Sequence, residues 1–409
     1  MKIALFPLAA LLLAGSHVAM AQNSVTVYGI LDGGVSTVSG IRGGTVKQLV
    51  SGIMDGSRIG FRGNEDLGGG YRALFTLENR LELDTGVLSN RPISGSQLPD
   101  RFSQAALLGL PAQLQPAVAA VAASLGGTVG VNLGGAFFDR QTFLGLVTPV
   151  GAVLAGRQYT PAFEVVATFD TLATQSSLAL GQVASLPSAI DIRLSNTIAY
   201  RIQKGGFTAS AMAGAGEGST STGRFLGAMA IYRGKGFSAG LGYNTRNNER
   251  AAKALTSTVF GVSVDVGPGK LNGVYGLVKD DNPAGLGTIS AAVGGGNTGA
   301  LVQNAFVNAF KQDGRLMQVG YRLERGPNTV YVAYNRFDDQ RAANADTSSY
   351  GVTYSYALSK RTDINAAVTR MVNSGLGQAA PGAAGYLGGV TASAGTDATG
   401  MALGVRHRF

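Results

Sequence analysis

A repeated two-residue alternation limits what this chain can fold into more than any other feature of its sequence. Segments of about ten residues, from "SVTVYGILDGGVSTV" to "ATGMALGVRHRF", alternate apolar with small or polar residues. Gly, Asn, Asp or Pro separates them, and sixteen such segments follow one another along the chain. Because successive side chains of a strand point to opposite faces, each segment predicts a β-strand with one apolar face. The sequence therefore predicts an all-β fold.

The connections between these segments alternate between two lengths. Short turns lie, for example, at 204–206 and 326–328, whereas long connections occupy 281–313 and 374–397. Strands joined in this way run antiparallel, so the short turns gather at one end of the sheet and the long loops at the other. This asymmetry is typical of outer-membrane barrels, in which short turns face the periplasm and long loops face the exterior.

The two faces of the predicted strands favour a barrel over a soluble sandwich. In "ATGMALGVRHRF" the large apolar residues keep to one face, while Gly, Ala and Arg occupy the other. A sandwich would fill its inner face with bulky side chains on every strand, whereas a wide, wet lumen accepts small and charged ones. Closure also removes the strand edges that such a sheet would expose. We therefore expect a 16-stranded antiparallel transmembrane β-barrel.

The last predicted strand ends on an aromatic residue without a polar tail. Met401, Leu403, Val405, His407 and Phe409 share one face of this strand. Terminal residues fray unless something holds them. We therefore expect the last strand to pair with the first, "VTVYGILDGG", and to close the barrel.

The first residues of the chain predict an export signal. Lys2 precedes an apolar run at 4–14, and Ala19-Met20-Ala21 has the small-x-small pattern of a signal-peptidase site. The run is too short to span a bilayer. We expect residues 1–21 to be a cleaved signal peptide and residues 22–409 to form the barrel.

The chain contains no cysteine, so it holds neither a disulfide framework nor a thiolate metal site.

The charge of the chain is basic but dispersed. Lys and Arg number 33 against 24 Asp and Glu, which gives a formal net charge of +9. A basic balance often indicates nucleic-acid binding. Here the basic residues stand singly at strand-like spacing, with no run longer than Lys360-Arg361. This pattern argues against a nucleic-acid partner.

Several stretches together resemble one known family, the general porins of Gram-negative outer membranes in their β-proteobacterial and neisserial branch. They are "SVTVYGILDGGV", "GSRIGFRGNEDLGGGYRALFTLE", "FFDRQTFLGLVTPVGAVLAGRQY", "RLSNTIAYRI" and the terminal "GVRHRF". The resemblance implies a homotrimer of sixteen-stranded barrels embedded in outer-membrane lipid and lipopolysaccharide. Each barrel would be a water-filled diffusion channel for small ions and solutes. Phe409 would belong to the signal that the outer-membrane assembly machinery reads.

The resemblance also implies where the channel is narrowest. The third external loop, 160–191, would fold into the lumen, and it carries acidic residues but no Lys or Arg. Family members set loop acids against basic residues of the barrel wall, which creates a transverse field. Glu164 and Asp170 are the candidate loop acids. The candidate wall residues are Arg58, Arg157 and Arg193, with Arg62, Arg72, Arg80 and Arg140 as further candidates.

For two of these arginines, the alternation itself supports a lumen-facing side chain. Arg58 and Arg62 alternate with Ile59 and Phe61, and Arg193 lies on the face opposite Leu194. An arginine at the lipid midplane would cost about 2–4 kcal/mol. With three guanidinium groups against two loop carboxylates, we expect the channel to prefer anions. The alternative is that these arginines occupy solvated wall positions without setting selectivity.

The second external loop, about 84–136, is longer than the family resemblance implies. Its apolar centre contains Pro111 and Pro116, which argue against a regular membrane-spanning helix. A loop that carries short helices is the expected structure.

Two other classes of function are less compatible with the sequence. A barrel enzyme would need a base, and of the two histidines, His17 lies in the predicted signal peptide and only His407 remains. No cofactor or metal site is expected, although carboxylates of external loops suit calcium. A substrate-specific channel, for example one for sugars, tends to line its path with aromatic residues. This chain contains no Trp, and most of its Tyr and Phe are predicted to face outward.

Overall fold

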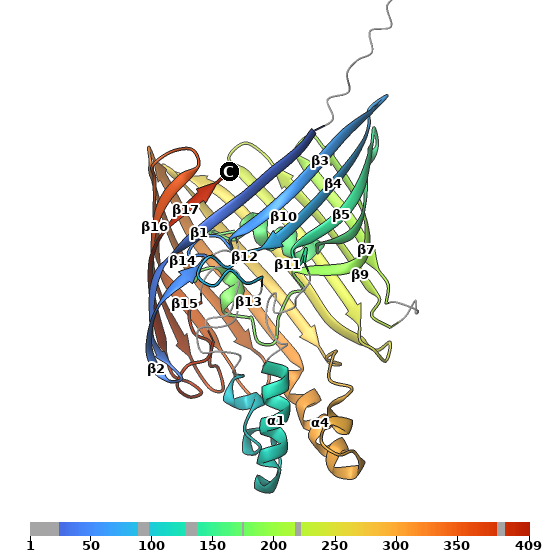
Figure 1. Cartoon of the computed structure of the whole chain (residues 1–409), viewed down its shortest axis with the longest axis vertical. Coiled ribbons are helices and arrows are strands. Elements are labelled where there is room, and N and C mark those ends of the chain that lie inside the picture. Colours follow the sequence, from blue (N-terminus) through green and yellow to red (C-terminus); the bar gives the residue numbers. More distant parts are fainter. Residues whose placement is uncertain (1–23, 89–97, 127–136, 174–175, 217–221, 383–388) are drawn as a thin grey trace, which may run out of the picture.

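The alternating segments form the wall of a closed antiparallel barrel (Figure 1). The computed structural model describes residues 24–88, 98–126, 137–173, 176–216, 222–382 and 389–409. The predicted signal peptide lies outside these residues. The strands are β1 (Ser24–Ile41), β2 (Gly44–Ser51), β3 (Arg58–Gly68), β4 (Tyr71–Arg80), β5 (Gln141–Thr148), β6 (Gly151–Tyr159), β7 (Arg193–Lys204), β8 (Phe207–Gly214), β9 (Phe225–Arg233), β10 (Phe237–Asn247), β11 (Lys253–Val266), β12 (Gly269–Asp280), β13 (Gln312–Arg325), β14 (Asn328–Asp339), β15 (Thr347–Ala357), β16 (Thr362–Asn373) and β17 (Ala398–Arg408).

Two of these strands share one place in the wall, so the barrel has sixteen strand positions, as predicted. Residues 24–30 of β1 pair with β3, and residues 33–41 of β1 pair with β2. Between β2 and β3 the chain bends, and the buried Asp32 carboxylate accepts the N–H groups of Ile53, Met54 and Asp55 at 2.7–2.9 Å. The second predicted strand is therefore longer than the sequence pattern indicated, because it begins at Gly44 and is interrupted by this bend.

The barrel closes between the first and last strands, as the end of the sequence predicted. β17 pairs with β1 from Arg408 opposite Ile30 to Thr399 opposite Ser39. Beyond this ladder, Phe409 and Gly29 exchange two backbone hydrogen bonds of 3.1 Å. Met401, Leu403, Val405, His407 and Phe409 are all exposed on the outer face. Apolar side chains exposed on the outside of a barrel are what contact with lipid requires.

The connections separate into a turn end and a loop end. Seven short turns, such as 205–206 between β7 and β8, lie at the end of the barrel that also holds Phe409 (Figure 1). The opposite end carries the long connections. We name three of them by their order: the second loop (81–140), the third loop (160–192) and the sixth loop (281–311).

The third loop lies inside the barrel, as the family resemblance implied. Its helix α2 (Pro161–Phe169) packs against β9, β10 and β11, and a short turn, η4 (Leu180–Gln182), follows. Glycines of the wall make room for the helix. A Cβ atom on Gly242 would lie 2.8 Å from Ala162 Cα, and one on Gly261 would lie 2.3 Å from the Phe169 ring. Phe169 is 1% exposed, so this loop has an apolar core within the lumen.

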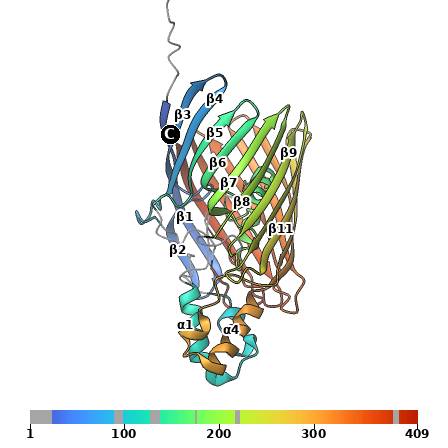
Figure 2. The ribbon, with the colours of Figure 1, turned by 90° about the vertical axis from the view of Figure 1, so that its right-hand side faces the viewer.

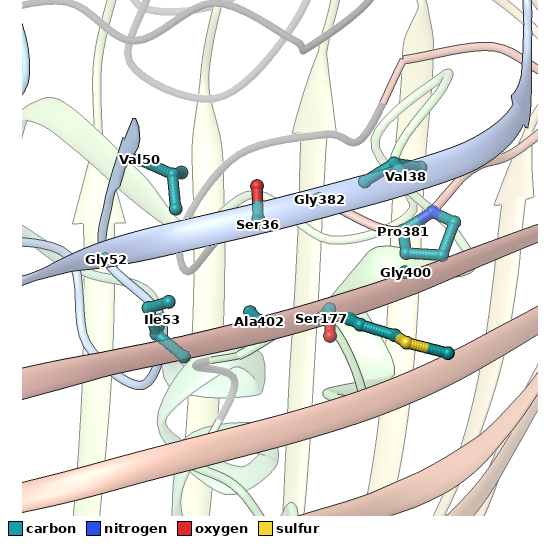
Figure 3. Close-up of a pocket in the computed structure, with 11 residues that line it drawn as sticks. Ser36, Val38, Val50, Gly52, Ile53, Ser177, Pro381, Gly382, Gly400 and Ala402 are labelled. Atoms are coloured by element: carbon teal, nitrogen blue, oxygen red, sulfur yellow. The ribbon is translucent and has the colours of Figure 1, made fainter. Parts of the chain in front are cut away.

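Beyond α2, the third loop continues along the wall to the closing strands. Asn335 of β14 donates to the carbonyl of Leu178 at 2.6 Å, and the hydroxyls of Ser177 and Thr369 of β16 are 2.7 Å apart. Figure 3 shows Ser177 lining a small cavity together with Ala402 of β17. The loop thus crosses the lumen from β6 to the seam between β17 and β1.

Helices of the second and sixth loops project from the loop end (Figures 1 and 2). Among the described residues, no helix is both long enough and apolar enough to cross a membrane. The second loop carries short helices. The helical segments are η1 (Asp100–Phe102), η2 (Ala106–Leu108), η3 (Ala112–Leu114) and α1 (Gln115–Gly126) in the second loop, and α3 (Ile289–Ala292) and α4 (Gly296–Phe310) in the sixth.

Candidate functional site

The third loop fills one side of the lumen and leaves the other side to the wall from β3 to β7. Its helix packs on β9 to β11, and its later residues bond to β13, β14 and β16. The remaining passage therefore runs beside the strands that carry the candidate arginines.

Five guanidinium groups gather on this wall, and cross-strand register accounts for several of their positions. Arg58 lies directly opposite Arg80 on β3 and β4, and Arg193 lies directly opposite Tyr159 on β7 and β6. Residues directly opposite each other project to the same face of a sheet. We call the five residues the arginine cluster: Arg58, Arg80, Arg140, Arg157 and Arg193.

A buried carboxylate lies at the centre of the arginine cluster. Glu78 of β4 accepts from Arg140 Nε at 2.6 Å and from the Tyr28 hydroxyl of β1 at 3.0 Å. Arg140 and Glu78 have side chains only 2% and 3% exposed. Their charges compensate each other away from water, so this pair shapes the wall rather than meeting a solute.

Tyr159 joins two arginines of the cluster. Its hydroxyl accepts from Arg140 Nη2 at 3.1 Å and from Arg193 Nη2 at 3.0 Å. The guanidinium carbon of Arg193 also lies 4.6 Å from the centre of the Tyr159 ring, which is a cation–π contact. Tyr159 stacks in turn on Phe163 of α2, with ring centres 5.1 Å apart. The third loop and the arginine cluster therefore meet at this tyrosine.

The arginines differ in how far they reach the passage. Arg80 is 1% exposed and lies 3.6 Å from Glu82 and 3.8 Å from Asp139. Arg58 pairs with Asp55 at 3.1 Å and is partly exposed. Arg157 and Arg193 are also partly exposed. Arg157 donates to the carbonyl of Asp139 at 2.6 Å and to the Ser195 hydroxyl at 3.1 Å.

The charges of the cluster do not balance. Five guanidinium groups are accompanied by four carboxylates, those of Glu78, Glu82, Asp55 and Asp139. Asp55 is also shared with Arg406, at 2.5 Å. The cluster is therefore net positive, and its partly exposed members present that charge to the lumen.

Arg62 faces the lumen but lies apart from the other predicted arginines. It follows Arg58 by four residues along β3 toward the turn end, and its guanidinium carbon lies 4.1 Å from the centre of the Tyr28 ring. The predicted wall residues that the structure brings together are Arg58, Arg80, Arg140, Arg157 and Arg193.

The two candidate loop acids do not face the arginine cluster. Glu164 forms an ion pair with Arg201 of β7 at 2.9 Å. Burial against the wall raises the pKa of the Glu164 carboxyl above its usual value, although the Arg201 guanidinium opposes the rise. Asp170 is 5% exposed, and its carboxylate accepts the N–H groups of Leu172 and Leu180 at 2.9 and 2.8 Å. Asp170 therefore holds the loop's own backbone rather than bordering the passage.

Sequence reasoning did not single out Glu78 and Tyr159. Both lie in strands whose alternation places them toward the lumen, and a glutamate on the same strand face as Arg80 was the available sequence signal. Their partners follow from cross-strand register, which a single strand pattern does not supply.

A closed sixteen-strand barrel with an apolar outer face, an inward-folded loop and a charged lumen defines a class, the channels of bacterial outer membranes. The chain belongs to the Gram-negative porin family, whose model matches residues 8–376. It is 28% identical over 429 residues to outer membrane porin protein 32 of Delftia acidovorans, with 100% of both chains covered. Over 81 residues, 19% of this chain and 24% of the relative, it is 41% identical to the major outer membrane protein P.IB of Neisseria meningitidis.

A solved structure shares the whole fold. The anion-selective porin from Comamonas acidovorans superposes with a TM-score of 0.67 at 23% identity, over 95% of this chain and 100% of that one. The family that the sequence resembled is thus confirmed. The protein is an outer-membrane channel and not an enzyme, because its family consists of porins.

Proposed function

We propose that this porin is a general diffusion channel that prefers small anions, and that the arginine cluster makes the selection. The observation that carries the proposal is the excess of guanidinium groups over carboxylates on the wall beside the third loop. Guanidinium groups stay ionised at any physiological pH. The screening length is about 8 Å at physiological salt, so ions in a narrow passage feel this excess.

Within the cluster, we assign the solute contacts to Arg58, Arg157 and Arg193. These three are partly exposed, whereas Arg80 and Arg140 are buried. The structural neighbour from Comamonas acidovorans is described as anion-selective, which is consistent with this assignment.

Replacement of exposed arginines tests the proposal. Arg58→Ala combined with Arg193→Ala removes two positive charges, so the zero-current potential in a salt gradient should move toward cation preference. The anion-to-cation permeability ratio should fall several-fold in planar bilayers. Arg325→Ala is the matched control, because this exposed arginine lies at the turn end. An unmodified channel that already prefers potassium to chloride would overturn the proposal.

The solute specificity is tested separately. A general channel gives liposome swelling rates that fall smoothly with solute size, whereas saturation by one solute indicates a substrate-specific channel.

We further propose that three copies assemble in outer-membrane lipid and lipopolysaccharide. Among the described residues, β2 pairs with β1 alone, so its second edge has no strand partner there. Around it, Val35, Leu49 and Leu83 are 42–69% exposed. An open strand edge beside apolar side chains favours coverage by a neighbouring subunit.

We also propose that the exposed Phe409 is read by the outer-membrane assembly machinery.

A further inference from the structure

The helices outside the barrel form a body with its own apolar core, which we call the cap. It consists of η1, η2, η3 and α1 of the second loop and of α3 and α4 of the sixth loop. The rings of Phe102 and Phe310 approach to 4.3 Å between centres across the two loops. Val118 of α1 and Val302 and Phe306 of α4 are completely buried within this core.

The two loops of the cap start from opposite walls of the barrel. The second loop joins β4 to β5, and the sixth joins β12 to β13. Strands β5 to β12 lie between these connections on one side. The remaining eight of the sixteen positions lie between them on the other side. Loops that begin half a circumference apart therefore meet in one core beyond the external end of the barrel, where α1 and α4 project together (Figure 2).

The cap contains almost no charge. Neither residues 102–138 nor residues 282–310 include an Asp, Glu, Lys or Arg. The exposed side chains of α1 and α4 include Ala, Asn and Leu301, so the cap adds no field of its own at the entrance. A solute passing it meets a steric obstacle rather than an electrostatic one.

Ties to other loops hold the cap in place. Arg101 of η1 donates to the carbonyl of Leu186 in the third loop at 2.5 Å. It also donates to the carbonyl of Leu376 at 3.0 Å. Arg341, between β14 and β15, donates to the carbonyl of Ala309 at 3.0 Å. The cap is therefore fixed relative to the constriction rather than hanging free.

We propose that the cap is an entry filter, which selects solutes by size at the external mouth, in series with the arginine cluster that selects by charge. The solutes that it excludes are larger hydrophilic molecules, whether neutral or anionic. The inference rests on the channel function. If no solute produced swelling, the channel itself would be in question, whereas an unchanged size profile would count against the filter alone.

Two adjacent residues of α4 provide a matched test. Val302→Asp places a charge at a position that is 0% exposed, whereas Leu301→Asp places the same charge at one that is 47% exposed. A buried unpaired charge opens an apolar core, and an exposed one does not. Val302→Asp should raise the swelling rate for a neutral trisaccharide, relative to that for a pentose, several-fold. Leu301→Asp should leave the ratio unchanged.

A loop replacement keeps the test decisive if Val302→Asp does not open the cap. A variant in which a short Gly-Ser link replaces residues 286–309 lacks α3 and most of α4, while the β12–β13 ladder stays intact. It should show the same raised trisaccharide-to-pentose ratio, with the zero-current potential unchanged. A ratio equal to that of the unmodified protein, in a variant that still runs as a folded barrel on unheated gels, would overturn the proposal.

Discussion

At the scale of single side chains, the wall arginines divide by what surrounds them. Arg140 is buried against Glu78 and Tyr159, so its charge is compensated within the wall. Arg157 and Arg193 are partly exposed. Arg157 donates to a carbonyl and a hydroxyl, and Arg193 donates to the Tyr159 hydroxyl. Arginine therefore has two roles on this wall. The buried side chains fix the shape of the wall, and the partly exposed ones present positive charge to the lumen.

The pair between Glu164 and Arg201 predicts that selectivity depends on pH. Because burial raises the pKa of the Glu164 carboxyl, it takes up a proton at a higher pH than an exposed glutamate does. Protonation removes a negative charge and leaves Arg201 and the nearby Arg233 uncompensated. Anion preference should therefore increase as the pH falls through this range. Zero-current potentials measured at a series of pH values would follow the change.

Glu164→Gln is the control for this dependence. The variant should show the higher anion preference already at neutral pH and should lose the step at acidic pH. Persistence of the step in the variant would assign it to another buried carboxyl, such as Asp191 or Glu82, because burial raises the pKa of these groups too.

The lumen-facing positions of the arginines were easier to predict from the sequence than the surroundings of the loop acids. Arg58 and Arg193 stand in alternating strands, whose lumen-facing side is fixed by a local pattern. Asp170 lies in an irregular loop, and its carboxylate turns inward because Leu180, ten residues on, presents its N–H group. A contact of that kind depends on how the loop folds, which no periodicity encodes.

At the scale of elements, the position of α2 follows from small residues in the wall. Gly242 and Gly261 leave the space that Ala162 and Phe169 occupy. The first turn of the helix is also held by Asn244 of β10, whose side-chain oxygen accepts the N–H of Ala162 at 3.1 Å. The third loop therefore packs where the wall side chains are smallest, and the passage forms on the side that bears the arginine cluster.

Gly261→Leu should displace the third loop. The new side chain would meet the Phe169 ring, and overpacking of this kind costs about 1–3 kcal/mol. Because the strand ladder is not touched, the barrel should still form, while single-channel conductance should change and become noisier. Phe260→Leu changes a side chain that is 49% exposed on the outer face of the same strand, so it serves as the control. Equal conductance in Gly261→Leu and the unmodified protein would show that the contact does not position the loop.

The sequence pattern predicted the sixteen strand positions, but it did not predict the bend between β2 and β3. Alternation is local, so each wall position was found from its own residues. The segment Gly44–Ser51 was missed because the bend after it depends on Asp32, a residue about twenty positions earlier that binds the backbone of the bend. The inward course of the third loop followed from the family resemblance, since its supporting glycines are spread over distant strands.

We expect removal of Phe409, the residue that follows β17, to impair assembly. Phe409 exchanges two backbone hydrogen bonds with Gly29, and its ring packs where a Gly29 side chain would otherwise lie. Deletion of Phe409 should lower the amount of folded protein in the outer membrane several-fold, with little change in the conductance of channels that do form. Quantitative blots of membrane fractions measure the first effect. Normal levels of the truncated protein would contradict the assembly role.

At the scale of the whole molecule, the proposed entry filter, the cap, precedes one constriction that the third loop and the arginine cluster form together. Arg101 links the cap to the third loop, and Tyr159 links the third loop to the arginine cluster through Phe163. A change at the external loops is therefore connected to the constriction by contiguous packing.

The proposed trimer predicts behaviour that a single barrel would not show. Unheated samples in mild detergent should run on gels as an oligomer, and heating should convert it to a band near the 41.8 kDa chain mass, less the signal peptide. Light scattering in the same detergent should give three copies per particle. A particle of one copy under gentle extraction would contradict the proposal.

The seam between β1 and β17 has a consequence for how the molecule acquires its shape. It joins residues at almost opposite ends of the chain, such as Leu31 and His407. Contacts between such distant residues form late and slowly, because the whole intervening chain must be ordered first. Until β17 arrives, β1 keeps an unpaired edge that can join another chain. Successful folding therefore depends on chaperones that keep newly made chains apart until they reach the membrane. Truncation from the carboxyl end should yield aggregates rather than smaller barrels.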